Sequence, residues 1–320
     1  MDEHTGLMHA DYGGLPRAVE ADEILREIWI EDTYHSSALE GNALSRKQVE
    51  HLLETDHASG RLSDTLEVRG YASAARWVYQ HAPDHPPGEG VPVSAIRTVH
   101  TELQSLAWRL SPPDDGTQPG QWRRRGAKIA GSTVQTPPPI AIDGVLADWM
   151  EATGAEGDHE HWLYHLADLH AWFERIHPFA DGNGRAGRLL MNFMLLQRGY
   201  PPAVFDATER ERYLRALARA DDGNSGMLAE LIARAVETNI TKLLIPRLAG
   251  DVRLIPLGAL AAESQYSPGY LRTLAANGRL RAVREGKLWL SSRTWLEEYK
   301  VGRQRARRPG SIAVRPDEGG

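Results

Sequence analysis

The run His177–Arg188 constrains the fold more than any other part of the chain, because it joins two helical patterns through a glycine-containing turn. It reads His-Pro-Phe-Ala-Asp-Gly-Asn-Gly-Arg-Ala-Gly-Arg. Apolar residues recur at helical spacing over residues 160–176 before it and 189–196 after it. Gly182 and Gly184 allow backbone angles closed to other residues, so amide N–H groups can converge on an anion at the start of the second helix. The run therefore predicts a helix–loop–helix unit whose loop binds phosphate.

The polar residues of this run have the chemistry of a phosphate-transfer site. Arg185 and Arg188 are three residues apart and so lie on one face of the first helical turn. Each guanidinium can donate a pair of hydrogen bonds to phosphate oxygens. Asp181 can hold Mg²⁺ against a diphosphate, and His177 can take a proton from an attacking hydroxyl. A plain turn with surface arginines is the alternative for an isolated Gly-Asn-Gly, but the fixed offsets of the surrounding residues argue against it.

The same run resembles the signature of the Fic family, His-x-Phe-x-(Asp/Glu)-Gly-Asn-Gly-Arg-x-x-Arg, at every specified position. Members of that family mostly transfer AMP from ATP to a protein hydroxyl. The resemblance implies that His177 is the general base, that Asp181 is the Mg²⁺ ligand and that Phe179 anchors the loop in the core. It places the phosphates of ATP among the following residues: Gly182, Asn183, Gly184, Arg185 and Arg188.

A second match lies near the start of the chain, in the run Ser-Ser-Ala-Leu-Glu-Gly-Asn that begins at Ser36. Taken alone, this run is a capped helix end with a solvated glutamate. It resembles the inhibitory motif of Fic proteins, (Ser/Thr)-x-x-x-Glu-(Gly/Asn), with Ser36, Glu40 and Gly41 in place. In that family the glutamate pairs with the second motif arginine, here Arg188, and so competes with the γ-phosphate. The resemblance implies an N-terminal inhibitory helix, and the same glutamate could position water for removal of AMP in some states.

Residues 120–141 predict a β-hairpin, for which an ordinary surface hairpin is an equal alternative. Gly120–Arg123 and the later Thr-Pro-Pro-Pro run resemble the flap that edges the Fic active site and registers the target segment by strand addition. By that resemblance, Ile129 and Ala130 lie near the docked peptide. Tyr213 is placed at the border of the base pocket, although a helical tyrosine beside leucine is usually a core residue.

The composition limits the class of protein and the number of domains. The 320 residues are 41% apolar and 25% charged, as in globular proteins, and have room for two domains. The sequence has no cysteine, which excludes disulfides and thiol catalysis. The N-terminus is acidic and leads into no apolar run, so we expect neither a signal peptide nor a membrane span, and a cytoplasmic protein is the default.

Charge is divided unevenly along the chain. Residues 251–310 hold twelve Lys and Arg against five Asp and Glu, a net charge of +7, which leaves −13 for the remainder of a chain whose total is −6. A basic C-terminal segment on an acidic body indicates a polyanionic partner for that segment, and DNA is the expected one.

The pattern of this C-terminal segment predicts helix, turn, helix, hairpin, helix. A short helix is expected over 254–263, and Ser267-Pro268 starts another that ends at Ala276. Glu285-Gly286 is a hairpin signal between residues 280–284 and 287–290, and a final helix spans 293–299. The order resembles small winged-helix modules of the excisionase or MerR type, and a basic structural cap is the alternative. The resemblance implies DNA contacts from four residues: Tyr270, Arg272, Thr273 and Lys287.

The sequence thus predicts a mainly α protein, with a Fic helical fold and a β-hairpin flap followed by a small winged-helix domain. The expected parts are an N-terminal helical region with the inhibitory motif (1–90), the Fic core (91–247), the winged helix (251–302) and a disordered tail (303–320). The expected function is an autoinhibited adenylyltransferase that uses ATP and Mg²⁺ to modify a Ser, Thr or Tyr hydroxyl of a target protein or of itself; a homodimer is left open. The rival is a transcriptional regulator whose Fic body only senses nucleotide. The intact His177 argues against it, because a sensor needs no base.

Overall fold

The structure is a computed structural model, which describes residues 18–57, 60–129, 134–155, 162–240, 254–262, 264–285 and 287–307. The chain divides into two compact units, of which one is Ala18–Leu244 and the other contains residues 254–307. In the part of the chain that is described, no helix is both long and apolar enough to cross a lipid bilayer.

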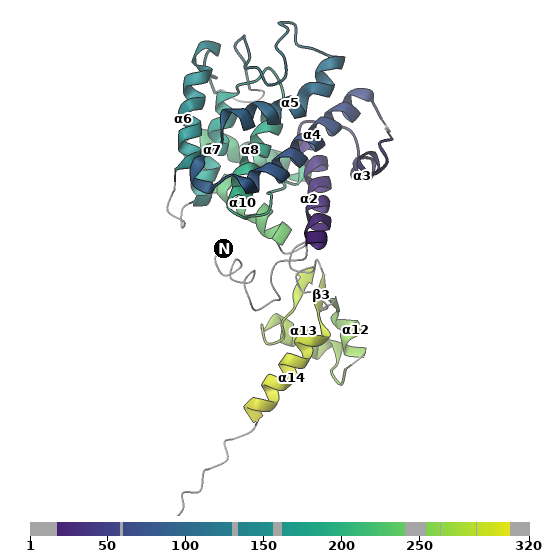
Figure 1. Cartoon of the computed structure of the whole chain (residues 1–320). Helices are drawn as coiled ribbons and strands as arrows, with labels where there is room; N and C mark the ends of the chain where they lie inside the picture. Colours follow the sequence, from purple (N-terminus) through teal and green to yellow (C-terminus); the bar gives the residue numbers. More distant parts are fainter. Residues whose placement is uncertain are drawn as a thin grey trace, which may run out of the picture. The chain divides into compact units, whose positions relative to one another are not determined.

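The first unit is a bundle of α-helices (Figure 1). In chain order the helices are α2 (Ala18–Leu39), α3 (Arg46–Thr55), α4 (Leu62–His81), α5 (Val93–Leu110), α6 (Ile142–Gly154), α7 (Trp162–Ile176), α8 (Asn183–Gln197), α9 (Arg210–Asp221) and α10 (Gly226–Asn239). Single 3₁₀ turns lie between them: η1 (Ala82–Asp84), η2 (Pro87–Glu89), η3 (Pro139–Ala141) and η4 (Ala207–Glu209).

Helix α8 forms the centre of this unit. It is buried on nearly all sides, and α2, α4, α5 and α7 pack against it. A helix that is apolar around most of its circumference must be enclosed, and Leu189, Leu190 and Phe193 of α8 are completely buried. Because α8 is held by four neighbours, the position of its N-terminus is fixed by the core, and residues 177–188 sit at that end.

The helices expected before and after residues 177–188 are present as α7 and α8. Helix α3 begins with a capping box, in which Ser45 is the N-cap and Gln48 is its partner. Helix α6 was not predicted, because Gly144 and the prolines just before it masked its pattern. Within the described part of residues 120–141, the expected hairpin is reduced to one isolated bridge between Lys128 and Gln135. Ala130 lies outside the described residues.

The second unit surrounds a small apolar core of its own. It consists of β1 (Ile255–Pro256), α12 (Leu257–Ala262), α13 (Pro268–Ala276), β2 (Val283–Glu285), β3 (Leu288–Ser291) and α14 (Arg293–Arg307). The strands form an antiparallel sheet in the order β1-β3-β2, in which Val283 pairs with Leu290 and Ile255 with Ser291. Leu260, Leu271 and Leu296 are among the residues of the core.

Two details of this unit differ from the sequence prediction. Strand β1 opens the segment that was expected to be wholly helical, and it completes the sheet by pairing with β3. Helix α14 continues to Arg307, whereas a disordered tail was expected from residue 303. The Ser267 cap of α13 is as predicted, with its side chain accepting a hydrogen bond from the Tyr270 amide.

Candidate active site

His177 lies at the point where α7 ends and the loop to α8 begins. Its amide donates to the Phe173 carbonyl at 3.1 Å, and its φ of 49° is in the left-handed region, where histidine occurs more often than most residues. Nδ1 lies 3.2 Å from the Glu174 carbonyl, which can only accept, so Nδ1 carries the proton and Nε2 has its lone pair free. Burial lowers the pKa of His177, which favours the neutral imidazole. The residue is therefore set up to take a proton at Nε2.

The N-terminus of α8 is built to receive an anion. Gly182 is its N-cap, with a φ of 76°, and has no side chain to occupy the free amides of the first turn. A Cβ on Gly182 would lie 2.5 Å from the side-chain nitrogen of Gln104, and one on Gly184 would lie 2.6 Å from Oε1 of Glu40. Glycine is therefore favoured at position 182 by its backbone angle, and a side chain at either position would displace the end of Gln104 or of Glu40.

Two buried side chains of the motif, Phe179 and Asn183, hold the loop between His177 and α8 in its conformation. The side chain of Asn183 accepts from the Phe179 amide and donates to the Phe179 carbonyl, both at 2.9 Å, and is buried. Phe179 is completely buried and stacks on His100, with ring centroids 3.6 Å apart, so the expected anchor is confirmed. The side chain of Asn183 therefore serves to fix the conformation of the loop.

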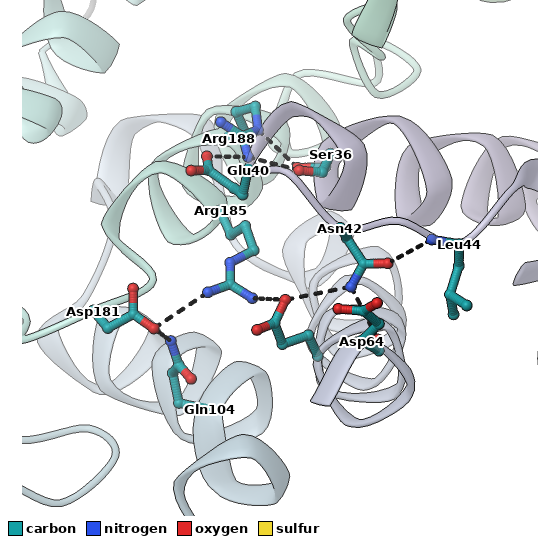
Figure 2. A network of polar contacts seen from close by, with 10 residues as sticks. Ser36, Glu40, Asn42, Leu44, Asp64, Gln104, Asp181, Arg185 and Arg188 are labelled. Carbon is teal, nitrogen blue, oxygen red and sulfur yellow. Dashed lines mark hydrogen bonds and ion pairs between the residues drawn. The ribbon is translucent and has the colours of Figure 1, made fainter. Parts of the chain in front are cut away.

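Asp181 and Arg185 form a second polar group at the helix end, drawn in Figure 2. Oδ2 of Asp181 accepts from Gln104 at 3.0 Å and from Arg185 at 3.5 Å, and Arg185 also lies 3.8 Å from Glu67. The Arg185 side chain is buried, whereas that of Asp181 is 76% exposed. Within the described residues no group of three or more metal-ligating side chains occurs. Mg²⁺ in nucleotide sites is commonly held by one or two carboxylates and the substrate phosphates, so a single exposed carboxylate here fits that ion.

Arg188 is held by residues of α2, which lie about 150 positions earlier in the sequence. Figure 2 shows Ser36, Glu40 and Arg188 meeting. Nε of Arg188 donates to Oγ of Ser36 at 2.7 Å, and NH2 donates to the Ser36 carbonyl at 3.0 Å and to Oε1 of Glu40 at 2.8 Å. The Arg188 side chain is 3% exposed. Burial opposes ionisation of Glu40, but the Arg188 guanidinium outweighs it, so the pKa of Glu40 lies below its ordinary value. The ion pair is therefore fully formed at neutral pH.

The turn after α2 fixes where Glu40 lies. Gly41 has a φ of 94°, which a side chain would strain. Asn42 then donates to the Asp64 carbonyl at 3.0 Å and accepts from the Leu44 amide at 3.1 Å. These contacts join the end of α2 to the first turn of α4 (Figure 2). The glycine of the motif thus permits the turn, and the residue after it fastens the turn to the bundle.

Asp32 is part of the same arrangement and was missed in the sequence. It lies one helical turn before Ser36 and two before Glu40, on the same face of α2. Its buried carboxylate accepts from the hydroxyls of Tyr71 and Tyr79, at 2.9 and 2.8 Å, and from Asn192 of α8 at 3.4 Å. Burial raises the pKa of Asp32 to about 6 despite these donors. The available signal was its spacing, because Asp32 lies four residues before Ser36 and eight before Glu40.

Tyr213 lies in the core beneath Arg188 rather than at an open surface. It is 5% exposed, its hydroxyl is 2.7 Å from Nε2 of His170, and its ring packs on Phe205. The Arg188 guanidinium lies 5.9 Å from the ring centroid. This placement matches the core alternative more closely than a place beside the nucleotide base.

The expected DNA-contacting residues lie on the surface of the second unit. Tyr270, Arg272 and Thr273 are exposed on α13, and Lys287 is exposed between β2 and β3. The Tyr270 and Tyr299 hydroxyls are 3.1 Å apart. Three of the four therefore share one helix, and the fourth is at the tip of the hairpin.

A family model matches part of the chain. Residues 91–195 match the model of the Fic/DOC family. This region runs from just before α5 into α8 and includes the whole of residues 177–188. Ser36 and Glu40, which contact Arg188, lie outside it.

The curated relatives include two insect proteins, each named protein adenylyltransferase Fic. The relative from Drosophila willistoni is 27% identical over 246 residues, or 75% of this chain and 47% of its own length. The relative from Culex quinquefasciatus is 28% identical over 293 residues, or 88% of this chain and 55% of its own length. The chain thus spans about half the length of the curated relatives it matches.

Solved structures support the fold. Fic-1 from C. elegans superposes with a TM-score of 0.59 at 23% identity and covers 76% of this chain and 67% of its own. A Fic-domain signalling protein from Bacteroides thetaiotaomicron gives a TM-score of 0.58 at 24% identity, with 71% and 90% covered. A Fic family protein from Desulfovibrio desulfuricans gives 0.54 at 21% identity and covers 91% of this chain. The predicted mainly helical Fic fold is confirmed at this level.

Proposed function

We propose that this chain is an autoinhibited protein adenylyltransferase that transfers AMP from ATP to a hydroxyl of a protein. The observation that carries the proposal is the contact of Glu40 and Ser36 with Arg188 in the first turns of α8. The loop that leads into this helix begins at His177, whose Nε2 is free to accept a proton. The names of the curated relatives support the same reaction.

In the proposed reaction the target hydroxyl attacks the α-phosphorus of ATP while Nε2 of His177 accepts the hydroxyl proton. The bond between the α-phosphorus and the bridging oxygen of the β-phosphate breaks, and pyrophosphate leaves with that oxygen. The amides of the first turn of α8, together with Arg185, stabilise the negative charge on the phosphates. Asp181 would hold Mg²⁺ together with these phosphates, and the ion would supply further neutralisation of their charge.

The proposed inhibition acts on Arg188. Its guanidinium would bind the γ-phosphate, and in the structure Glu40 already occupies it. The carboxylate also repels an incoming phosphate, so ATP binds productively only when α2 withdraws Glu40. With Glu40 in place, the same carboxylate could direct a water toward a bound AMP–protein bond and remove the modification.

The decisive experiment compares the wild type with Glu40→Gly in the presence of ATP labelled on the α-phosphate. We expect the variant to label itself or a target well above the wild type, and Arg188→Ala to lower labelling in both backgrounds. A Glu40→Gly protein that behaves like the wild type across ATP concentrations would refute inhibition. Parallel reactions with GTP, CTP and UTP define the base preference.

The role of His177 is tested in the Glu40→Gly background. His177→Ala should reduce transfer by the ~10²–10⁴-fold typical of a positioned base and leave ATP binding largely intact, because the base acts on the target. Calorimetric titration with ATP separates the two effects. A nucleotide sensor would instead lose nothing when His177 is replaced, so the same variant decides against the rival function.

For the second unit we propose duplex DNA as the partner. The specific observation is that exposed residues lie on α13 and at the hairpin tip, in a segment of net charge +7. They are Tyr270, Arg272 and Thr273 on α13 and Lys287 at the tip. With a winged-helix arrangement, α13 would enter the major groove, with Arg272 near the bases. Arg272→Ala in the full chain should then relax sequence preference, whereas Arg305→Ala should weaken binding to all sequences alike. Electrophoretic shifts at several salt concentrations test this, and a chain that binds neither its own promoter nor random duplex at low salt would exclude DNA.

A further inference from the structure

Arg123 is a buried arginine that joins the segment after α5 to the catalytic loop. It is 3% exposed. Its guanidinium makes four hydrogen bonds, all to main-chain carbonyls: Nε to His177 at 2.8 Å, NH1 to Arg125 at 2.8 Å, and NH2 to Pro137 at 2.6 Å and Ile176 at 3.5 Å. Its own amide donates to the Pro178 carbonyl at 2.8 Å.

These bonds explain how a buried cation is tolerated at this position. Ile176 is the last residue of α7, and the final carbonyls of a helix have no partner within it. A cation at this end is also favoured by the helix dipole. Arg123 therefore serves as a C-terminal cap supplied by a distant segment, and burial lowers its pKa.

The cap lies at a strained residue. His177 has a φ of 49°, a conformation that persists only where the surroundings enforce it. The hydrogen bond from Nε of Arg123 to the His177 carbonyl, together with the bond from the Arg123 amide to Pro178, holds the main chain on the C-terminal side of His177. The orientation of the imidazole depends on that main chain.

A second connection ties the same segment to the loop. The Gly120 amide donates to Nδ1 of His100 at 2.8 Å, so Nε2 carries the proton and donates to the Asp181 carbonyl at 3.0 Å. Residues 120–123 are thus fastened both before and after the apolar anchor Phe179. This segment and the loop are therefore joined at two places.

We propose that Arg123 is a positioning residue for the transfer reaction, which holds His177 in the left-handed conformation that presents its imidazole to the target hydroxyl. The inference rests on the proposed function. Its consequence is a specific kinetic pattern: loss of the guanidinium slows transfer and leaves ATP binding unchanged, because the bonds of Arg123 end on residues 125, 137, 176, 177 and 178 and not on α8.

The test uses the full chain in the Glu40→Gly background, with Arg123→Gln, Arg123→Lys and a control, Arg124→Gln. The control removes the same charge from the neighbouring residue, whose exposed side chain donates to Gln121. We expect Arg123→Gln to lower the labelling rate at saturating ATP at least tenfold and to change the ATP dissociation constant less than twofold. Arg123→Lys keeps the charge but not the planar guanidinium, so its labelling rate should lie between those of Arg123→Gln and the parent. Arg124→Gln should label at the rate of the parent.

A ¹⁵N NMR spectrum of His177 supplies a readout that needs no activity. The parent should show a single Nδ1–H tautomer, and Arg123→Lys should show both tautomers or a broadened signal. A folded Arg123→Gln protein with parental rate would overturn the proposal, and so would a loss of rate matched by an equal loss of ATP affinity. If neither variant folds, Arg123 is a stability residue only and the proposal fails. If the Glu40→Gly parent does not label at all, the proposed function fails, and the NMR comparison still decides whether Arg123 holds His177.

Discussion

Replacement of the buried carboxylate in α2, Asp32→Asn, should make the protein more stable at neutral pH. Asp32 is 3% exposed, and burial raises its pKa from 3.8 to about 6, even though Tyr71, Tyr79 and Asn192 all donate to it. The native protein therefore binds the proton of this group more tightly than the unfolded chain does. Between pH 3.8 and about 6 the unfolded group is ionised while the native one is still protonated, so the free energy of unfolding falls as pH rises through this window.

The magnitude follows from the shift. About 2 pKa units at 1.36 kcal/mol each give a penalty of about 3 kcal/mol once the group is ionised in both states, above pH 6. Asparagine has the same shape and carries no charge, so the penalty disappears. Part of the gain is offset, because the amide accepts at one atom only and one tyrosine hydroxyl must reorient. Of the stability difference between the two proteins, roughly 2 kcal/mol should develop between pH 4.5 and 7.5.

Urea denaturation of the wild type and Asp32→Asn at several pH values measures this directly. Taking the difference between the two proteins cancels the contributions of other titrating groups, including the buried His100. Tyr79→Phe is the companion variant: loss of its donor should cost more stability in the wild type than in Asp32→Asn, because a charged acceptor loses more. A difference between wild type and Asp32→Asn that is constant from pH 4.5 to 7.5 would refute the reasoning.

Three further changes have defined outcomes. Ser36→Ala leaves Nε of the buried Arg188 without its hydroxyl acceptor, so the free energy of unfolding measured in urea should fall by about 1–3 kcal/mol. The same variant should raise labelling less than Glu40→Gly does. Burial lowers the pKa of His100 to about 4, so the wild type loses up to about 3 kcal/mol of stability as pH falls from 6.5 to 4, and His100→Gln should flatten that fall in the same titration. Gly182→Ala places a Cβ at a φ of 76°, 2.5 Å from a glutamine side chain, and should weaken calorimetric ATP binding at least tenfold.

The sequence was most informative where function requires residues that are close together in the chain. The run His177–Arg188 predicts a helix–loop–helix, and the structure has one, because glycine spacing and helical periodicity are local properties. The pairing of Glu40 with Arg188 is a contact over 148 positions, and only the resemblance to a family motif could predict it. The roles of Arg123 and Asp32 were missed for the same physical reason: a buried polar side chain is defined by partners that lie far away in sequence.

The hairpin expected over residues 120–141 shows the limit of local patterns. Glycine and proline at its two ends predict a turn, but what holds the described part of this segment is Arg123 and His100, not a ladder of strand hydrogen bonds. Helix α6, which follows, has a glycine near its start and forms because Leu146 and Trp149 pack into the core. In both cases tertiary contacts override weak local preference.

The contacts of α2 with α8 suggest why one helix can regulate the site. Asp32, Ser36 and Glu40 lie on one face of α2 at intervals of four, and Arg188 and Asn192 lie four apart on α8, so the two helices meet through successive polar pairs. The Glu40 pair is at the solvent edge, whereas Asp32 is buried. Release of Glu40 therefore needs only the last turn of α2 to move, while Asp32 keeps the rest of the helix in place. A variant that unfastens that turn, such as Asn42→Ala, should raise labelling without the loss of stability that removal of all of α2 would cause.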